Sequence, residues 1–245
     1  VPEKTNREII ITNVRGDVFM DRSNDNKKII VKNSQKELYY LYDFAEPSSV
    51  LNINAAFNNL RKETVKEVAF HPFEPNKLIM ETKSGLYLLD VKRLNLETLL
   101  KPLPAVWTVK NPSIYYFTEK NYVLASLNLA VKTETNLAQN PFPFLPKTVK
   151  KIQVSPADDK IAFLTNLDDL YVLTILSQKF EKIAHNSGDF VFSPDNKKIA
   201  ILDKDGKISV HFPDDYAEDL NKKAGDVIRI DLENKEKIKK IYWYK

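Results

Sequence analysis

The sequence predicts an all-β fold built from five similar units, on two observations. Short runs rich in Ile, Val, Leu, Tyr and Phe alternate with turns rich in Asn, Asp, Lys and Pro, the pattern of strands joined by tight turns. One arrangement of these runs also recurs: residues 65–100 and 149–184 each read as strand, proline-containing turn, strand, polar turn, strand, short break and strand. Only residues 52–63, "NINAAFNNLRKE", predict a helical turn, which lies in a connection.

The repeats can be placed by the last residue before each proline-containing turn, which is Phe70, Val154 or Phe192. The distance from Phe70 to Val154 is about twice that from Val154 to Phe192, so a further copy is expected between them, and a degraded one ends its first strand at Val109. A looser copy near the N-terminus has Arg22 at this position. We therefore expect a single domain over residues 1–245, with repeats at 16–54, 63–100, 101–139, 147–184 and 185–236 and the start of another at 237–245.

Four strands in a period of about 40 residues are typical of the blades of a β-propeller. The nearly continuous apolar runs "KKIAILD" and "GLYLLDV" suit strands that are packed on both faces, as in stacked sheets. The expected fold is thus an all-β propeller with five recognisable four-stranded blades, either as a ring or as part of a larger or incomplete one. The alternative is a β-sandwich or barrel, which does not require matching turns at matching offsets.

The turn "SPDNKKIA" at 193–200 resembles the "SPDGKKIAF"-type turn of bacterial TolB-like propellers. Partial matches occur at 155–162, at His71-Pro72 and at 23–28. WD-repeat propellers are similar in architecture, and Asp90 lies where their Trp-Asp pair would end, but their Gly-His and Trp-Asp dipeptides are missing. The resemblance covers most of the chain and implies the fold only, because propellers of this type serve as scaffolds, ligand binders and enzyme appendages.

Composition excludes several classes of protein. The net charge of +4 is small, and both signs are interspersed, which argues against nucleic-acid binding. The absence of cysteine excludes disulfides and thiolate zinc sites. No apolar run is long enough to span a bilayer, so no direct membrane insertion is expected.

The chain begins with Val-Pro, which predicts a processed or excised segment of a larger protein. Composition leaves the compartment open. Lys- and Asn-rich propellers of this kind resemble the outer portion of bacterial surface proteins, which implies an extracytoplasmic or cell-surface location. The strand-like run at 7–12 and the end of the chain at 237–245 are candidates to complete a terminal blade.

No motif for catalysis, metal binding or a cofactor is found, so we expect no enzyme activity, no metal site and no cofactor. The three histidines, His71, His185 and His211, lack metal-ligand spacing, and structural or surface roles are expected for them. The motif "DKDGK" at 203–207 has the aspartate spacing of half a calcium loop, but a hairpin turn with Gly206 at positive φ explains it better. The recurring serines of the Ser-Pro turns are explained by a bond from hydroxyl to backbone.

Three segments are candidates for binding, and each has a structural alternative. The insertion at 211–226 is either a binding loop or a solvated variable loop; its acidic residues are Asp214, Asp215, Glu218 and Asp219. The segment 139–147, "QNPFPFLPK", is either a cover on a blade or an exposed aromatic groove. An aromatic cluster is either a sugar-stacking platform or part of the core; it consists of Trp107, Tyr115 and Tyr116.

The first strand of each blade should face the central axis, so polar residues on these strands are expected to line a wet channel. They are Lys66, Glu67, Lys151, Gln153 and Asp189. The lysine-rich run at 234–240 reads as the solvated face of an edge strand, where lysine opposes pairing with other chains.

These features predict a non-enzymatic protein-interaction scaffold. The alternative is a propeller that binds a small ligand or glycan at the channel mouth and its aromatic loops. The expected partner is another protein, not nucleic acid. The ligand-binding residues and the oligomeric state are not assigned by the sequence.

Overall fold

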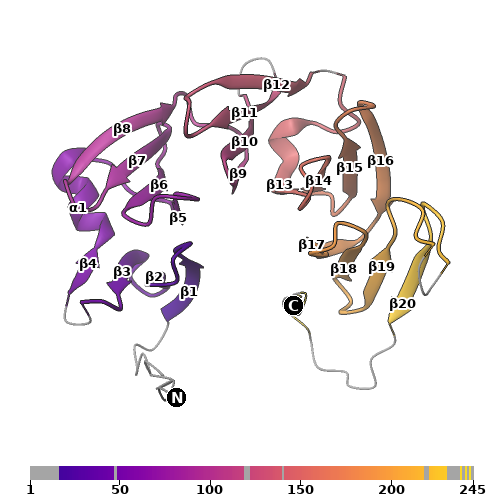
Figure 1. Cartoon of the computed structure of the whole chain (residues 1–245), viewed down its shortest axis with the longest axis horizontal. Coiled ribbons are helices and arrows are strands. Elements are labelled where there is room, and N and C mark those ends of the chain that lie inside the picture. Colours follow the sequence, from indigo (N-terminus) through magenta and orange to yellow (C-terminus); the bar gives the residue numbers. More distant parts are fainter. Residues whose placement is uncertain are drawn as a thin grey trace, which may run out of the picture. The chain divides into compact units, whose positions relative to one another are not determined.

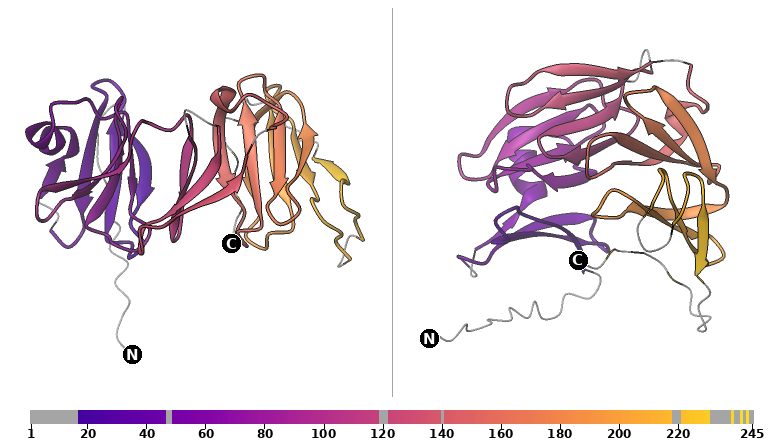
Figure 2. Two further views of the ribbon diagram at one scale, coloured as in Figure 1. Left: turned by 90° about the horizontal axis from the view of Figure 1, so that it is seen from above. Right: turned by 45° about the vertical axis from the view of Figure 1, so that its right-hand side comes forward.

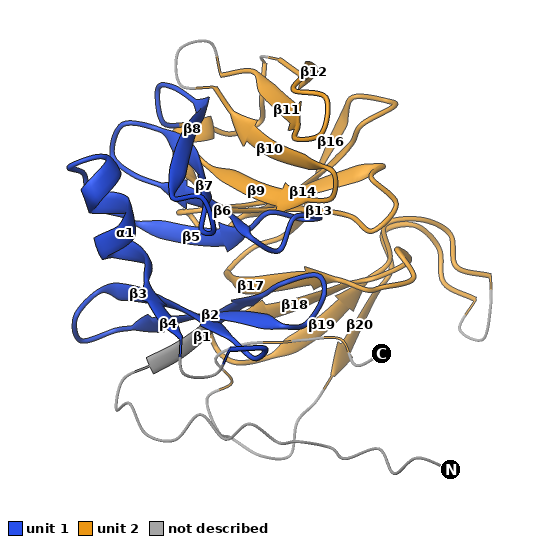
Figure 3. Ribbon diagram, turned by 60° about the vertical axis from the view of Figure 1, so that its left-hand side comes forward, with its two compact units in different colours: residues 1–103 blue, residues 104–245 orange. Residues whose placement is uncertain are grey.

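A computed structural model describes residues 17–46, 49–118, 122–139, 141–217 and 221–230, together with residues 238, 241 and 243 (Figure 1). The predicted fold class is confirmed: the described residues form five antiparallel sheets of four strands each, as in propeller blades. The chain divides into two compact units, residues 1–103 and residues 104–245 (Figure 3).

The first unit contains two sheets, each of which runs in sequence order from its first strand to its last. The strands of the first sheet are β1 (Asp17–Arg22), β2 (Lys28–Asn33), β3 (Leu38–Asp43) and β4 (Val50–Asn52). Those of the second are β5 (Glu67–Phe70), β6 (Lys77–Glu81), β7 (Leu86–Asp90) and β8 (Asn95–Leu100). The predicted helical turn is α1 (Ile53–Leu60), which lies in the connection between the two sheets.

The two sheets of this unit share one core. Alternate residues of β2 and β3, such as Ile30 and Leu41, pack in the same cluster as Phe70 and Leu78 of the second sheet. Helix α1 adds Phe57, whose ring lies edge-on to that of Tyr87 at 5.9 Å. The helix begins where the side chain of its N-cap residue, Asn52, accepts a hydrogen bond from the backbone N–H of Ala55.

The second unit contains three sheets, again in sequence order. The strands of its first sheet are β9 (Trp107–Lys110), β10 (Ser113–Phe117), β11 (Leu124–Asn128) and β12 (Glu134–Ala138). The next sheet follows a 3-10 turn, η1 (Pro146–Thr148), and consists of β13 (Val149–Val154), β14 (Lys160–Thr165), β15 (Leu170–Thr174) and β16 (Lys179–Ala184). The last consists of β17 (Ser187–Phe192), β18 (Ile199–Asp203), β19 (Ile208–His211) and β20 (Val227–Ile230), and the twist of such sheets is visible in Figure 2.

Strand β14 shows why the apolar runs of the sequence are nearly continuous. Ile161 and Phe163 pack on the sheet that precedes it, whereas Ala162 and Leu164 pack on the sheet that follows it. Because successive side chains of a strand point to opposite faces, a strand between two sheets needs apolar residues at every position. Strand β7, from the run "GLYLLDV", is likewise buried from Leu86 to Leu89.

The recurring turn between the first two strands of a blade rests on one buried hydroxyl, as the sequence predicts. The Ser155 hydroxyl accepts a hydrogen bond from the N–H of Lys160 at 3.1 Å, and the Ser193 hydroxyl accepts one from Lys198 at 2.9 Å. Ser23 makes the same contact with Lys28. In the second blade, His71 replaces the serine, and its Nδ1 accepts a hydrogen bond from the N–H of Glu74. The histidine is 1% exposed and has the structural role expected for it.

A second recurring bond ties this turn to the end of the third strand. The backbone N–H of Phe44 donates to the carbonyl of Lys27, and the N–H of Val91 donates to that of Asn76. Ile175 makes the equivalent bond to Asp159 in the second unit. In these three blades the bond holds two turns together at one end of the sheet, and in the first unit this end carries the candidate site.

Some predictions fall outside the described residues: the run at 7–12, most of the lysine-rich run at 234–240 and most of the further repeat at 237–245. Within the last of these, Trp243 packs against the cluster of Val210, Phe212 and Tyr216, and its Nε1 donates to the carbonyl of Val191 at 3.1 Å. Among the described segments, no helix has the length and hydrophobicity that crossing a bilayer requires.

Candidate functional site

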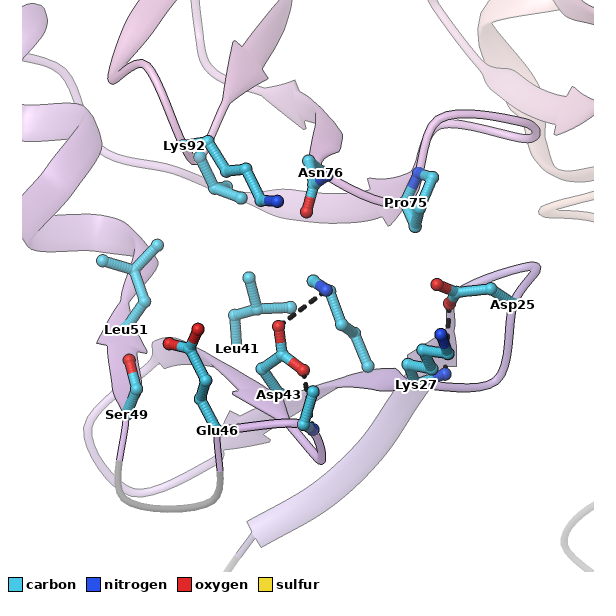
Figure 4. A pocket seen from close by; sticks show the side chains of 13 residues that line it. Asp25, Lys27, Leu41, Asp43, Glu46, Ser49, Leu51, Pro75, Asn76 and Lys92 are labelled. Atoms are coloured by element: carbon cyan, nitrogen blue, oxygen red, sulfur yellow. Dashed lines mark hydrogen bonds and ion pairs between the residues drawn. The ribbon is translucent and has the colours of Figure 1, made fainter.

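A pocket of about 440 Å³ lies between the two sheets of the first unit (Figure 4). We call it the inter-sheet pocket. It lies at the end of the sheets where the paired turns meet, and each sheet supplies two of the connections around it. These connections contribute Asp25 and Lys27, Glu46 and Ser49, Pro75 and Asn76, and Val91 and Lys92.

The apolar part of the pocket is an outward extension of the core. Leu41 is buried, and Leu51 and Val91 are partly buried and pack against the same cluster that joins the two sheets. Pro75 adds a further apolar surface in the turn before β6. The hydrophobic packing that forms the unit therefore also fixes the separation of the pocket walls.

One charged pair in the pocket wall is already satisfied. The ammonium group of Lys28, which is 8% exposed, lies 2.7 Å from the carboxylate of Asp43. Burial by itself would raise the pKa of Asp43, but hydrogen bonds from Lys28 and from the N–H of Ala45 outweigh it and keep this pKa below its ordinary value. The pair is a fixed, neutral part of the wall.

Asp25 is similarly occupied. Its carboxylate accepts hydrogen bonds from the hydroxyl of Ser23 at 2.7 Å and from the N–H of Lys27 at 3.1 Å, and these two bonds lower its pKa. The Oδ1 atom of Asp25 thus closes its own turn, while its Oδ2 atom accepts no hydrogen bond from the described residues.

Asn76 and three charged side chains in the pocket have no such partner among the described residues. The Oδ1 atom of Asn76 is buried and accepts no hydrogen bond. Within the described part of the chain, the side chains of Lys27, Glu46 and Lys92 form no hydrogen bond or ion pair, and all three are exposed. In Figure 4, the carboxylate of Glu46 and the amide oxygen of Asn76 point into the pocket from opposite walls. A buried acceptor without a donor is costly unless a ligand or water satisfies it.

The arrangement can hold a ligand that is partly apolar and carries hydrogen-bond donors. Its volume is within the range of pockets that bind small molecules or side chains. Neither a nucleophile with an adjacent base nor a metal centre is formed there. Throughout the described segments, no group of three or more His, Asp or Glu residues is placed to hold a metal ion.

The aromatic cluster predicted as a possible sugar platform does not form one. Tyr115 and Tyr116 are 8% and 3% exposed, because strand β10 is buried along its whole length. Trp107 is half-buried at the start of β9. The core alternative is correct for the two tyrosines, since a stacking platform needs exposed ring faces.

The segment 139–147 is a cover, the first of its two alternatives. Phe142 and Phe144 pack on the rings of Phe117 and Phe180 at 5.1–6.2 Å. Leu145, by contrast, is 60% exposed. The two phenylalanines therefore extend the core of the second unit, and no open aromatic groove is formed by them.

The insertion at 211–226 is folded back onto its own unit in its described part. Phe212 and Tyr216 are buried against Val210 and Ile228. The carboxylate of Asp214 lies 2.6 Å from the ammonium of Lys160, on the preceding sheet. Asp215 is exposed, and Glu218 and Asp219 lie outside the described residues. The described insertion is thus anchored at two points and is not a freely solvated loop.

Of the polar residues expected along the channel, the structure brings two together. The ammonium of Lys151 on β13 donates to the carbonyl of Phe190 at 2.7 Å and pairs with the carboxylate of Asp189 on β17. The Oε1 atom of Gln153 is buried without a partner, and Glu67 is exposed in the first unit. These bonds fasten neighbouring sheets, which gives the Lys151–Asp189 pair a structural role.

The remaining histidines are separate from the pocket. His185 is exposed and its Nδ1 lies 2.9 Å from the carboxylate of Asp169. His211 is 3% exposed on β19. In the "DKDGK" motif, Gly206 has a φ of 85°, and the N–H of Lys207 bonds to the Asp203 carboxylate at 2.8 Å, which confirms a hairpin turn.

Sequence reasoning did not find the inter-sheet pocket. Its free groups come from turns that are far apart in the chain, and each of these residues reads as an ordinary turn residue. The available signal was the repeat itself: aligned turns of two adjacent blades predict that Glu46 and Asn76 lie at the same end of their sheets.

No family model matches the sequence, and no curated protein matches it. Solved structures are similar in fold. Hydrazine synthase from Kuenenia stuttgartiensis aligns over 95% of this chain and 70% of its own, with a TM-score of 0.58 and 12% identity. Hsv2 from Kluyveromyces lactis aligns over 82% of this chain and 62% of its own, with a TM-score of 0.54 and 16% identity.

The β-propeller domain of Swd1 from Myceliophthora thermophila covers 78% of this chain, with a TM-score of 0.50 and 9% identity. This chain spans 67% of that domain, or about two thirds of its length. At such identities the likeness concerns architecture alone. Together with the five four-stranded sheets, it shows that the chain has the β-propeller fold.

Proposed function

We propose that the protein is a non-enzymatic interaction scaffold that holds a protein partner at the inter-sheet pocket. The observation that carries the proposal is a combination of three features: the buried acceptor Asn76 Oδ1, an apolar wall, and the charged side chains of Lys27, Glu46 and Lys92. Among the described residues, neither the acceptor nor these charges have a partner. Protein interfaces combine a buried apolar centre with a few polar groups in this way.

A scaffold role also fits the rest of the molecule. The repeats bring together serine hydroxyls and ionic groups, and most of these form structural bonds. Ser155 bonds within its turn, and Lys151 bonds between two sheets. The glycan alternative is not favoured, because Tyr115 and Tyr116 are buried. The resemblance of the turn at 193–200 to TolB-like propellers remains a prediction about family, and a place in a larger bacterial protein remains part of the proposal.

Capture of partners from a lysate of the native organism tests the proposal, with two matched variants. Ser49→Trp fills the pocket from an exposed position on its rim, whereas Ser177→Trp adds the same indole to an exposed turn of the second unit. We expect crosslinking capture to recover a protein with the wild type and with Ser177→Trp, and to lose it with Ser49→Trp.

Retention of that partner by Ser49→Trp would show that the pocket is not the docking point. A third bait, in which a short Gly-Ser loop replaces residues 213–225, then tests whether the partner docks on the insertion instead. Failure of the wild type to capture any protein would contradict the scaffold proposal itself.

A further inference from the structure

The last sheet of the second unit has one face that packs on the sheet before it and a second face that is also apolar. Phe192 and Ile199 belong to the first face. Ala200, Val210 and Ile228 are cross-strand partners and therefore share the second face. In stacked repeat proteins, a terminal unit needs a polar outer face to remain soluble, so this apolar face indicates that something covers it.

The equivalent face of the preceding sheet shows what a covered face looks like. Ala162 on β14 and Leu170 on β15 are 0% exposed, because Phe192 of the last sheet packs in the same cluster. Their counterparts in the register of the last sheet, Ala200 and Ile208, are only half-buried. The last sheet thus has the apolar side chains of an inner sheet, but the described residues cover them less completely.

Where a sheet follows another, three side chains at the start of its blade supply this cover, at the first, fourth and sixth positions of a six-residue stretch. In residues 149–154 they are Val149, Ile152 and Val154, which pack in one cluster with Tyr115 of the preceding sheet. A register shift between Val149 and Lys151 turns the first position to the same face as the other two. The same positions are buried in two other blades, as Val65, Val68 and Phe70 and as Ser187, Phe190 and Phe192.

Residues 238–243, "IKKIYW", repeat this spacing near the end of the chain. Ile238, Ile241 and Trp243 fall at the first, fourth and sixth positions, and all three are half-buried. Lysines occupy the second and third positions, as they do in residues 149–154. The segment therefore has the pattern of a first strand of a blade.

Trp243 also lies where the sixth position of such a strand should lie. Val210 has the register position on the last sheet that Val172 has on the preceding one. Phe192 packs in the cluster of Val172, and Trp243 packs in the cluster of Val210. The Nε1 atom of Trp243 is fixed by the carbonyl of Val191 at 3.1 Å. Trp243 is thus placed on the last sheet as Phe192 is placed on the sheet before it.

We propose that the apolar face of the last sheet is a strand-docking surface, and that its occupant is this chain's own segment 238–243, docked as the first strand of a sixth sheet. The connection has a suitable length: residues 231–237 are intermediate between residues 101–106 and 139–148, which join other consecutive sheets. The surface belongs to the second unit, so the inference is independent of the inter-sheet pocket and of the function proposed for it.

Fluorine NMR of the full chain labelled with 5-fluorotryptophan tests the inference. The chain has two tryptophans, so two signals are expected, and Trp243→Phe assigns them. In the folded protein, the Trp243 signal should differ from its position in the urea-denatured chain, because the indole packs among apolar side chains. The Trp107 signal reports in the same spectrum whether the second unit is folded.

Variants of the segment test whether it docks as a strand. Ile238→Asn and Ile241→Asn each place a polar group on the apolar face, so each should move the Trp243 signal most of the way to its denatured position and leave the Trp107 signal in place. Lys239→Asn is the matched control at the second position, which is exposed in the equivalent strands, and should leave both signals unchanged.

Variants of the last sheet test the surface itself. Ile228→Asn changes the apolar face and should release Trp243 in the same way. Val227→Asn changes the adjacent residue of β20, which is 49% exposed and points to the opposite face, and should leave the Trp243 signal unchanged.

An unchanged Trp243 signal in either isoleucine variant would overturn the inference, because Trp243 would then be a single anchor and not part of a docked strand. So would a Trp243 signal that stays in place in Ile228→Asn, or one that already lies at the denatured position in the wild type. Where a variant also moves the Trp107 signal, alanine replaces asparagine at the same site, and the same results decide.

Discussion

At the scale of single residues, the molecule depends on small polar groups placed where backbone bonds would otherwise be missing. The hydroxyl of Ser155 is fully buried and accepts a hydrogen bond from the N–H of Lys160. It donates its own proton to the carboxylate of Asp159 at 2.7 Å. The same geometry recurs at Ser23 and Ser193 because the turn needs an acceptor at this point, whatever the rest of the repeat contains.

Replacing one of these hydroxyls should therefore be costly. Ser155→Ala leaves the buried N–H of Lys160 without an acceptor from the turn, and we expect the free energy of unfolding to fall by about 1–3 kcal/mol. Urea denaturation measures this loss. The matched variant Ser177→Ala removes an exposed hydroxyl and should change stability by less than about 0.5 kcal/mol. Equal stability of the two variants would show that the turn does not depend on the hydroxyl.

A second consequence at this scale concerns pH. Burial lowers the pKa of His211 in the folded state, and the charge of Glu181 opposes this only in part. The unfolded chain therefore binds a proton more readily, so stability is lost as pH falls below the ordinary histidine pKa of about 6.5, by at most about 1.4 kcal/mol per pH unit for one proton. The lowered pKa values of carboxylates such as Asp43 act only in more acidic solution.

Denaturation of His211→Gln between pH 7.5 and 5.5 checks this prediction. The variant should be less dependent on pH than the wild type, whereas His185→Gln, at an exposed ring, should retain the fall in stability. A wild-type stability that rises on acidification over this range would contradict the assignment.

At the scale of elements, the segment before β13 shows how an irregular stretch becomes part of a core. Phe144 contacts the rings of Phe117, Phe163, Tyr171 and Phe180, so it joins β10 of one sheet to β14, β15 and β16 of the next. Prolines around the phenylalanines restrict the backbone and lower the entropy that is lost when the segment packs.

Removal of this ring should weaken the second unit. Phe144→Ala deletes a half-buried aromatic side chain, and we expect a loss of about 2–3 kcal/mol in thermal or chemical unfolding, somewhat less than for a fully buried phenylalanine. The neighbouring variant Leu145→Ala, at a 60% exposed position, should cost less than about 0.5 kcal/mol. Similar losses for the two would mean that the segment is not the cover described above.

The elements also show which features can be predicted from sequence. The turns were predictable because their causes are local: a serine, a short polar run and a residue such as Asn26 or Asn196 at positive φ occur within a few positions. The strands were predictable because burial on both faces leaves an uninterrupted apolar run. The sequence left open whether Tyr115 and the insertion are buried or exposed, because their burial depends on which side chains of another strand or sheet lie opposite them.

At the scale of the whole molecule, repetition explains both the fold and the difficulty of finding its site. Each blade supplies similar turns at the same end of its sheet. The turns differ in side chains such as Glu46 and Asn76, each of which reads as an ordinary turn residue in the sequence. The pocket exists because two such sets of turns face each other across a shared core. No sequence motif encodes the way these turns face each other. Composition and repeat spacing therefore predict the propeller fold but not the position of its binding site.

The central claim is that the inter-sheet pocket is where a protein partner is held. Site-specific photo-crosslinking in the native organism tests it most directly, with the photoreactive side chain placed at Ser49 on the pocket rim or at Ser177 on the matched exposed turn. We predict one protein adduct from Ser49 and none from Ser177. Adducts from Ser177 alone, or from neither position, would contradict the claim.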